Sequence, residues 1–217
     1  MSLAIFDLDN TLIGGDSDHS WGEFLVERNF VSPDIYKEAN DRFYREYQNG
    51  TLDIHEYLGF ALKPLSRIAP EELENLRVAF MKEKIHPLEL PKARALIEKH
   101  RHNGDDLLII TATNDFITTP IAQWLNIPNL LATTAEINNG RYTGCVAGTP
   151  CFQEGKVTRL NEWLKAYEGN LEGSFFYSDS ANDIPLLAKV ENPVAVDPDE
   201  RLSAHAEANQ WPIISLR

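Results

Sequence analysis

The sequence predicts an α/β protein built on a doubly wound parallel sheet, with an all-helical insertion near its N-terminus. Short apolar runs of strand length recur along the 217 residues and alternate with longer segments of helical periodicity. Such repeated strand–helix units favour parallel strands with helices on both faces. Between the first two strands, residues 16–86 show helical periodicity and no strand signal, which sets this stretch apart as an insertion.

The first strand, over residues 2–9, is centred on the apolar run Leu3-Ala4-Ile5-Phe6. Gly14-Gly15 interrupts the pattern and is a candidate hinge. Asp18-His19-Ser20 is expected to cap the first helix of the insertion. Three further helices of the insertion are predicted to begin at Ser32-Pro33, Asp53 and Pro70, the first of them ending near Asn49-Gly50 and the second broken by Pro64.

Strand–helix alternation resumes after Pro87. Asn139-Gly140 lies between short polar and aromatic flanks, which is typical of a β-hairpin turn. Leu160, Trp163 and Tyr167 recur at helical spacing, which favours a core-facing helix surface over a binding surface. The predicted strands are 107–111, 130–135, 174–178 and 194–196, and the predicted helices are 91–103, 116–125, 156–168 and 182–190.

Charge and composition narrow the function classes. The formal net charge is −13 at pH 7, from 33 acidic and 20 basic residues. This charge argues against nucleic acid or an anionic membrane as a partner, since both attract basic surfaces. No apolar stretch reaches membrane-spanning length and the N-terminus lacks the pattern of a signal sequence, so we expect a cytoplasmic protein with Cys145 and Cys151 as reduced thiols. Composition leaves open whether it is a monomer or a homodimer.

Two carboxylates follow directly on the first strand. In an extended chain alternate residues share a face, so Asp7 and Asp9 point the same way and repel each other. A cation between them removes the repulsion, and an oxygen-rich site of this kind suits Mg²⁺. A carboxylate at such a place can also be a nucleophile that forms an aspartyl-phosphate. The two carboxylates alone are thus compatible with a magnesium site and with a nucleophile at Asp7.

Polar residues at the ends of two later strands belong to the same predicted site. Thr111 and Asp179 end apolar strands, as Asp7 does, and ligands of open parallel sheets bind beyond these carboxyl ends. Each residue alone is explained equally well as part of a turn or a helix cap. Lys156 adds a positive charge at a helix start, where it opposes the helix dipole, and this favours a site for a phosphorylated substrate. Asp183, four residues after Asp179, is expected on the same helix face.

Four separated motifs are thus present in order: Asp7-Leu8-Asp9-Asn10-Thr11-Leu12, Thr111-Ala112-Thr113-Asn114, Lys156 and Ser178-Asp179-Ser180-Ala181-Asn182-Asp183. Their layout resembles that of the haloacid dehalogenase-like phosphatases, subfamily IB, the subgroup similar to phosphoserine phosphatase. The resemblance covers nearly the whole chain. It implies a Rossmann-like core domain formed by residues 1–15 and 87–217, with a helical cap domain over residues 16–86.

The resemblance implies a role for each motif residue. Asp7 is expected to attack phosphorus, while Asp9 acts as general acid and then as general base, with its backbone carbonyl on the metal. The Thr111 hydroxyl, the Ala112 N–H and the Lys156 ammonium are expected to bind the phosphoryl oxygens.

The implied cofactor is Mg²⁺. Asp7 and Asp179 are expected to ligate it directly, with Asp183 supporting the site or acting through water. Asn182 is expected to bind Lys156 or the substrate, or else to cap the following helix, and the sequence does not decide between these roles.

The insertion is expected to determine the substrate, a small phosphorylated metabolite. Phosphoserine phosphatases carry Glu nine residues after the nucleophile, where this chain has the shorter Asp16. They also carry Ser-Gly-Gly in place of Thr111-Ala112-Thr113, and Gly in place of Ser180. These departures leave the phosphatase chemistry intact and put serine specificity in doubt.

The segment 15–21 resembles a group that includes histidinol-phosphate phosphatases. This implies an amino-alcohol phosphate, with histidinol phosphate ahead of phosphoserine, because an acidic pocket with an aromatic residue suits a cationic amine and an imidazole. The candidate substrate contacts are Asp16, Asp18, His19, Trp21 and Asn182.

Several alternatives stay open at this point. Trp21 is explained equally well as a core residue, and Arg42 and Arg45, the candidates for a substrate carboxylate, as part of a solvated helix face. A phosphoserine phosphatase, a phosphotransferase or mutase that passes the phosphoryl group to a second alcohol, and a non-catalytic binding protein are the competing functions.

Overall fold

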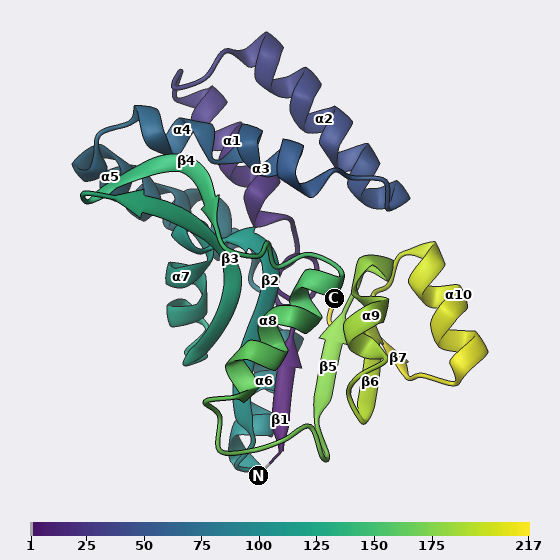
Figure 1. Ribbon diagram of the computed structural model, residues 1–217. Helices are drawn as coiled ribbons and strands as arrows, with labels where there is room; N and C mark the ends of the chain where they lie inside the picture. The colour runs from purple at the N-terminus through teal and green to yellow at the C-terminus, as the bar shows by residue number, and fades with distance from the viewer. Residues whose placement is uncertain (1) are drawn as a thin grey trace.

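The computed structural model describes residues 2–217 and contains one seven-stranded sheet in the order β4-β3-β2-β1-β5-β6-β7 (Figure 1). All neighbouring strands are parallel except β3 and β4, which form an antiparallel hairpin. The predicted doubly wound α/β class is therefore confirmed. The strands are β1 (Leu3–Phe6), β2 (Asp106–Asn114), β3 (Asn129–Asn138), β4 (Arg141–Ala147), β5 (Phe175–Ser178), β6 (Asn192–Val196) and β7 (Ile213–Ile214).

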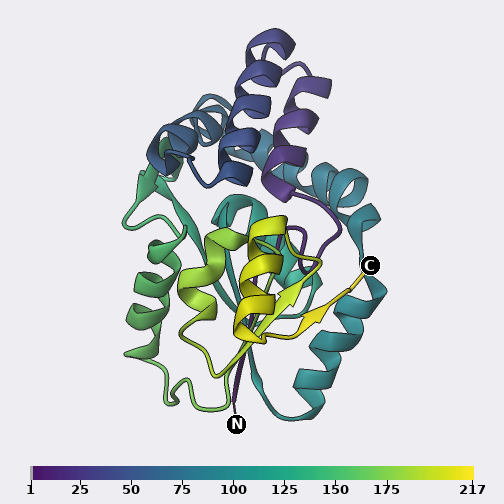
Figure 2. The same ribbon diagram turned by 90° about the vertical axis from the view of Figure 1, so that its right-hand side faces the viewer.

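Helices cover both faces of the sheet (Figure 2). The central strand β1 explains why both faces need a cover. Its residues alternate between two hydrophobic clusters, one on each face, and none of them is exposed. Ala4 and Phe6 pack with α6 and α7, whereas Leu3 and Ile5 pack with α8, α9 and α10. These helices are α6 (Pro91–His102), α7 (Asp115–Trp124), α8 (Glu154–Leu164), α9 (Ile184–Leu187) and α10 (Glu200–Asn209).

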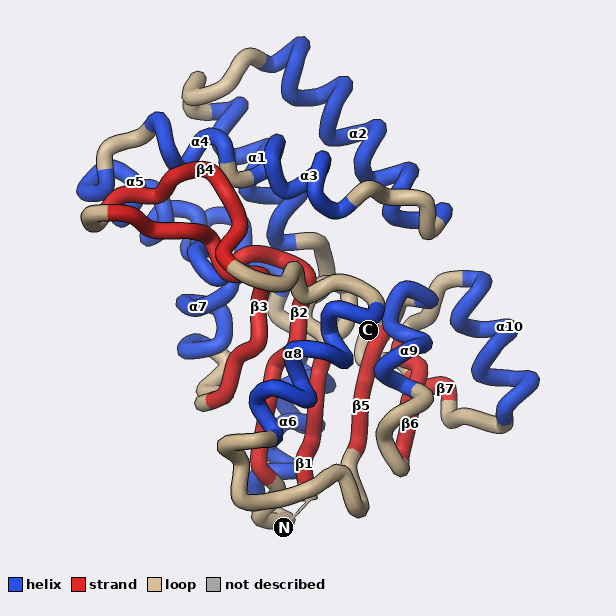
Figure 3. Tube along the Cα trace, in the orientation of Figure 1, coloured by secondary structure: helices blue, strands red, loops and turns tan. Residues whose placement is uncertain are grey.

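A helical region follows β1 and lies over the carboxyl ends of the strands (Figures 1 and 3). It contains no strand, as the sequence predicted. Its elements are α1 (Ser17–Glu27), α2 (Pro33–Asn49), α3 (Ile54–Ala61), α4 (Lys63–Arg67), α5 (Pro70–Phe80), a π-helical turn η1 (Met81–Ile85) and a 3₁₀ turn η2 (His86–Leu88).

The helix ends follow the sequence signals with one correction. The Asp16 carboxylate, rather than Asp18-His19-Ser20, caps α1: its Oδ1 accepts hydrogen bonds of 2.9 Å from the N–H groups of Asp18 and His19. Gly50 ends α2 in the left-handed conformation, and Asp53 caps α3, as predicted. After α3 ends, Pro64 lies in the first turn of α4, where its missing N–H is tolerated.

The two chain segments that join the helical region to the sheet run side by side. Ile13 forms an antiparallel bridge with Glu89, and the N–H of Gly14 donates to the carbonyl of Leu88 at 2.8 Å. A side chain at Gly14 or Gly15 would press on Leu90 or Leu88 at 3.1–3.2 Å. The double glycine thus permits close packing of the two connections.

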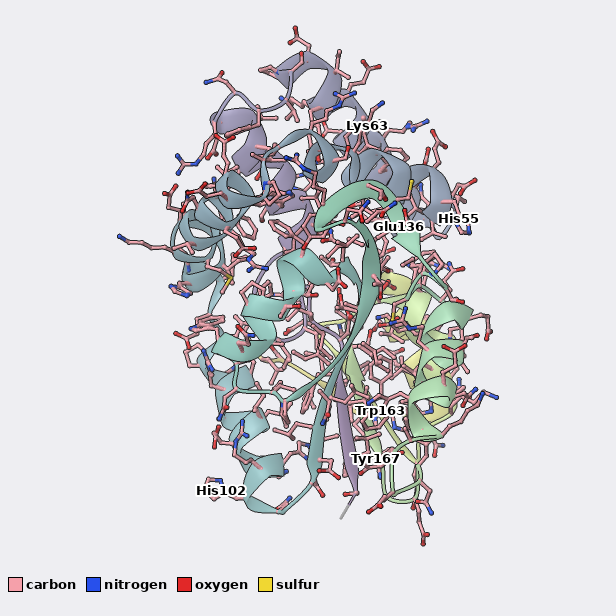
Figure 4. All side chains as sticks on the ribbon, turned by 60° about the vertical axis from the view of Figure 1, so that its left-hand side comes forward. His55, Lys63, His102, Glu136, Trp163 and Tyr167 are labelled. Atoms are coloured by element: carbon pink, nitrogen blue, oxygen red, sulfur yellow. The ribbon has the colours of Figure 1, made fainter. Side chains whose placement is uncertain are left out.

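The β3–β4 hairpin turns at Asn139-Gly140 as predicted, and β4 contacts α3 and α4 of the helical region. Figure 4 shows Glu136 on the hairpin and Lys63 on the helical region. The predicted helix 156–168 is shorter in the structure, since α8 ends at Leu164. The predicted core residues Leu160, Trp163 and Tyr167 all belong to or pack against the second cluster, and Tyr167, beyond the end of α8, stacks on Trp163 at 4.5 Å (Figure 4). The sequence did not predict α10 and β7, nor α4 as a helix separate from α3.

Candidate active site

The site is built around Asp7, the first residue after β1. Its backbone N–H donates to the carbonyl of Tyr177 on β5 at 2.9 Å, which fixes the chain where β1 and β5 end side by side. Its side chain accepts a 2.9 Å hydrogen bond from the Lys156 ammonium, which extends from the first turn of α8. Both residues are buried, at 4% and 3% exposure, so the ion pair is shielded from water.

Asp183 holds the other side of this ammonium. The Lys156 Nζ lies 2.7 Å from Oδ1 and 2.8 Å from Oδ2 of Asp183, and the Ser178 hydroxyl donates to Oδ2 at 2.7 Å. Burial alone would lower the pKa of Lys156, but the Asp183 and Asp7 carboxylates raise that pKa above its usual value. Lys156 is therefore a permanent positive charge held in place by two carboxylates.

Negative charge nevertheless exceeds positive charge here. Burial raises the pKa of Asp7 to about 6, and Asp183 adds to the effect while Lys156 opposes it. Burial also raises the pKa of Asp179 well above its ordinary value, with further contributions from Asp7 and Asp183. The Thr11 hydroxyl donates to Asp179 at 3.1 Å and supplies no charge. Asp7 and Asp183 both contact the Lys156 ammonium, and Asp179 adds a third carboxylate that no ion pair of the described residues neutralises.

This donor set fits a magnesium ion. A divalent cation offsets the excess charge, and Mg²⁺ prefers carboxylate and carbonyl oxygens together with several waters. Within residues 2–217, no three His, Cys, Asp or Glu side chains gather as a ready-made metal cluster. Asp7 and Asp179 have oxygens available, whereas Asp183 is engaged by Lys156 and Ser178. The set matches a site with one or two protein carboxylates, as Mg²⁺ commonly uses.

Asp9 is held by two donors from different parts of the fold. The N–H of Ser17, the first residue of α1, donates to Oδ1 at 2.7 Å, and the Thr113 hydroxyl donates to Oδ2 at 2.7 Å. Burial raises the pKa of Asp9 to about 8, with a further contribution from Asp16. A carboxyl group that retains its proton near neutral pH can serve as a general acid. Ser17 and Thr113 were not predicted as site residues.

Thr111 and Ala112 line the cavity next to Asp7 and Asp9. They lie at an irregularity of β2, where the pairing with β3 slips between Ile110 and Asn114. This interruption of the ladder turns residues 111–113 toward the cavity, as bulges near active sites commonly do.

The other wall of the cavity comes from the helical region. Asp16, Asp18 and His19, three of the residues expected to contact the substrate, line it. The Tyr57 hydroxyl donates to Oδ2 of Asp18 at 2.7 Å, and burial raises the pKa of Asp18 to about 7. Besides Thr113, the cavity residues that the sequence did not single out as site residues are Asn10, Asn40, Phe43, Tyr44, Tyr47, Leu52, Ile54, Tyr57 and Phe152.

Two candidate contacts lie elsewhere. Trp21 is 1% exposed and packs against Phe24, Phe80 and Phe116, so the structure favours the core alternative over an aromatic wall of the cavity. Asn182 accepts from Gln153 at 3.0 Å and donates to the backbone carbonyl of Tyr47 at 3.1 Å. It therefore connects α2 to the short 3₁₀ turn Ala181–Asp183 that precedes α9, and Ser180 rather than Asn182 caps that turn.

The two arginine candidates also lie outside the cavity lining. Arg42 donates to Glu56 on the exposed surface, and Arg45 is exposed. The structure favours the solvated-face alternative for both.

Comparison with known proteins identifies the family. The chain matches the haloacid dehalogenase-like hydrolase family over residues 4–188, and it belongs to that family, as the motifs predicted. Within the family it is a phosphatase-type enzyme. Across residues 2–217, no helix is both long and apolar enough to cross a membrane.

Among curated relatives, a protein named histidinol-phosphatase from Neisseria meningitidis serogroup C is 46% identical over 220 residues, covering 100% of this chain and 99% of that protein. A protein of Mycobacterium tuberculosis named phosphoserine phosphatase SerB1 is 32% identical over 220 residues, covering 100% of this chain and 71% of that protein.

Two solved structures show the same fold. A Bordetella pertussis protein of unknown function superposes with a TM-score of 0.93 at 39% identity, covering 100% of this chain and 99% of that chain. A phospho-aspartyl intermediate analogue of phosphoserine phosphatase superposes with a TM-score of 0.71 at 20% identity, covering 100% of this chain and 93% of that chain. The second likeness extends to the architecture alone.

Proposed function

We propose that this enzyme hydrolyses histidinol phosphate through a phospho-aspartyl intermediate on Asp7, with Mg²⁺ as cofactor. The observation that carries the reaction type is the convergence of Asp7, Lys156 and Asp9 on one cavity at the carboxyl ends of the strands. The full-length relative named histidinol-phosphatase supports the substrate.

The chemistry follows from the placement of these groups. The Asp7 carboxylate attacks phosphorus while the bond from phosphorus to the ester oxygen breaks, and the Asp9 carboxyl gives its proton to that oxygen, which leaves as an alcohol. Asp9 then accepts a proton from the water that attacks the phospho-aspartate. Lys156, the Thr111 hydroxyl and the Ala112 N–H bind the phosphoryl oxygens and stabilise their charge in the transition state.

Phosphatases of this family generally use Mg²⁺, and the donor set described above fits that ion. Asp7, Asp179 and the backbone carbonyl of Asp9 would hold it, while Asp183 fixes Lys156 beside them. Bound there, the ion neutralises part of the charge on the phosphoryl group and on its attacking carboxylate.

The charges of the cavity favour a cationic substrate. Asp16 and Asp18 line its helical wall, and among residues 2–217 Lys156 is the only Lys or Arg in the cavity lining. A substrate with an additional carboxylate, such as phosphoserine, would meet like charge at this wall. An ammonium or imidazolium would meet opposite charge, which favours histidinol phosphate.

The test compares kcat/KM for histidinol phosphate and phosphoserine in the wild type and in Asp16→Asn. Asn still caps a helix, so this variant removes the charge while keeping the start of α1. We expect the wild type to prefer histidinol phosphate, and Asp16→Asn to reduce that preference. A marked preference for phosphoserine, or no response of either substrate, would contradict the proposal.

A further inference from the structure

Thr113 makes a contact that the proposed roles leave unexplained. Its hydroxyl donates to Oδ2 of Asp9 at 2.7 Å, while the N–H of Ser17 donates to Oδ1. With one donor on each oxygen, the Asp9 carboxyl has a single defined orientation. Each carboxyl oxygen has two acceptor positions, so these bonds leave room for a proton directed into the cavity.

The two groups that donate to Asp9 belong to different parts of the fold. Ser17 begins α1 and belongs to the helical region, whereas Thr113 belongs to β2 in the middle of the sheet. A displacement of the helical region would move Ser17 relative to Asp9. It would leave Thr113 in place, because β2 pairs directly with β1, the strand that leads to Asp9.

Thr113 is itself held rigidly. It is 5% exposed, and its N–H donates to the Thr111 hydroxyl at 3.2 Å within the irregular stretch of β2. A hydroxyl on a β-branched side chain has few rotamers, so the donor arrives in one position. A general acid holds its proton in a reactive orientation only when the groups that bond to it are themselves fixed.

We infer that Thr113 is a positioning residue that sets the orientation in which Asp9 donates its proton to the leaving alcohol. The inference rests on the proposed function. In the step concerned, the bond from Asp7 to phosphorus forms, the bond from phosphorus to the ester oxygen breaks, and the proton passes from the Asp9 carboxyl to that oxygen. Thr113 keeps its own proton throughout and acts only through Asp9.

The experiment uses the dependence on the leaving group. Histidinol phosphate releases an alkoxide that requires a proton, whereas 2,4-dinitrophenyl phosphate releases a stable phenolate that requires none. The ratio kcat/KM reports steps up to phosphoryl transfer to Asp7, which separates this step from the later attack of water. We compare the two esters in the wild type, Thr113→Val and Thr113→Ser.

Thr113→Val keeps the side-chain shape and removes the hydroxyl. We expect its kcat/KM to fall about 10–100-fold on histidinol phosphate and to stay within about threefold of wild type on 2,4-dinitrophenyl phosphate, since general acid catalysis by the whole group is worth about 10²–10⁴. Thr113→Ser restores the donor and is expected to lie within about fivefold of wild type on both esters. A purely structural defect would lower both esters together.

Thr118→Val is the matched control. Thr118 is fully buried nearby on α7, and its hydroxyl donates to the Asn114 carbonyl at 3.0 Å, outside the cavity lining. It should leave the ratio of the two esters unchanged, and thermal unfolding of every variant reports folding independently. Equal loss on both esters in Thr113→Val, or no loss on histidinol phosphate, would overturn the role of Thr113 alone. A wild type inactive on both esters would overturn the proposed function and this role with it.

Discussion

The two walls of the cavity both bury carboxylates, but they compensate the charge differently. The first wall, here called the sheet edge, lies at the carboxyl ends of the central strands β1 and β5. There Asp7 and Asp183 share the Lys156 ammonium at 2.7–2.9 Å. In the helical wall, Asp18 receives only the phenol hydroxyl of Tyr57, and Asp16 receives only backbone N–H groups. The sheet edge has a fixed ammonium that compensates part of its charge. The helical wall, among the residues that the structure describes, has no Lys or Arg in the cavity lining and leaves its negative charge to be compensated by a ligand.

This difference indicates that the two walls have different tasks: the sheet edge carries out the reaction and the helical wall selects the substrate. A carboxylate that acts as the nucleophile must keep one geometry and stay ionised, and a fixed ion pair favours both. A carboxylate that selects a substrate works best when it has no counter-charge in the protein. Its pairing with a cation then adds to the binding free energy only of ligands that carry one. The comparison predicts that variants at the sheet edge affect every ester, while variants in the helical wall affect only substrates with a cation.

The largest effect is expected for Asp7→Asn. An amide does not attack phosphorus, so turnover of every phosphate ester should fall by about 10⁴ or more, while the protein stays folded. Beryllofluoride with Mg²⁺, which mimics an acyl-phosphate, should raise the melting temperature of the wild type and leave that of the variant unchanged. Retention of most of the activity by Asp7→Asn would rule out the covalent mechanism.

Removal of the metal should have the next largest effect. EDTA is expected to lower activity by about 10³ or more on all esters, and added Mg²⁺ to restore it, because the buried carboxylates then lose their counter-charge. Asp179→Asn should require a much higher Mg²⁺ concentration, measured by titration of activity. Asp34→Asn, which removes an exposed carboxylate on α2, is the control and should titrate as the wild type does. Full activity of the metal-free protein would exclude this assignment.

The contrast between the two walls also explains what the sequence could predict. Asp7 and Asp179 follow directly on strand ends, Thr111 lies in the irregular last part of β2, and Lys156 lies in the first turn of α8. The parallel sheet therefore brings them together. The contact between Asp18 and Tyr57 joins two helices through packing, and no spacing in the sequence specifies it. Chemistry set by topology was predictable, whereas chemistry set by helix packing was not.

Local misassignments have similar physical causes. Three neighbouring residues, Asp16, Ser17 and Asp18, can all cap a helix, and tertiary structure selects Asp16. Trp21 has the chemistry to stack on an imidazole, but the aromatic cluster of α1, α5 and α7 buries it. The unpredicted helix α10 does carry a signal, since the Asp199 side chain caps it.

Asp18→Asn should change how stability depends on pH. The pKa of Asp18 rises from its ordinary 3.8 to about 7, mainly through burial, with Asp16 adding to the rise and the hydrogen bond from Tyr57 opposing it. Between these values the folded state binds more protons than the unfolded state, so wild-type stability falls as pH rises through this range. Asn avoids the cost and still accepts from Tyr57, so the variant should be more stable at pH 8 by up to about 4 kcal/mol.

The measurement is thermal or urea unfolding of both proteins at pH 5 and pH 8 without substrate. The advantage of Asp18→Asn should be larger at pH 8 than at pH 5. Asp41→Asn, an exposed change of the same charge on α2, should show little dependence on pH. An advantage of Asp18→Asn that is equal at the two pH values would contradict a buried, uncompensated carboxyl group.

The smallest effect, and the one that separates the two walls most directly, concerns selectivity. A cationic substrate would neutralise Asp18, so Asp18→Asn should lower kcat/KM for histidinol phosphate by about 10–100-fold, the value of one charged contact in a buried site. For p-nitrophenyl phosphate, which has no cation, kcat/KM should change by less than about threefold, because Asp7, Asp9 and Lys156 are untouched. The same variant would thus gain stability at pH 8 and lose selectivity. This is expected of a carboxylate that lowers the stability of the free protein and contributes to substrate binding. Equal losses on the two esters would place Asp18 with the reacting groups and abolish the distinction between the walls.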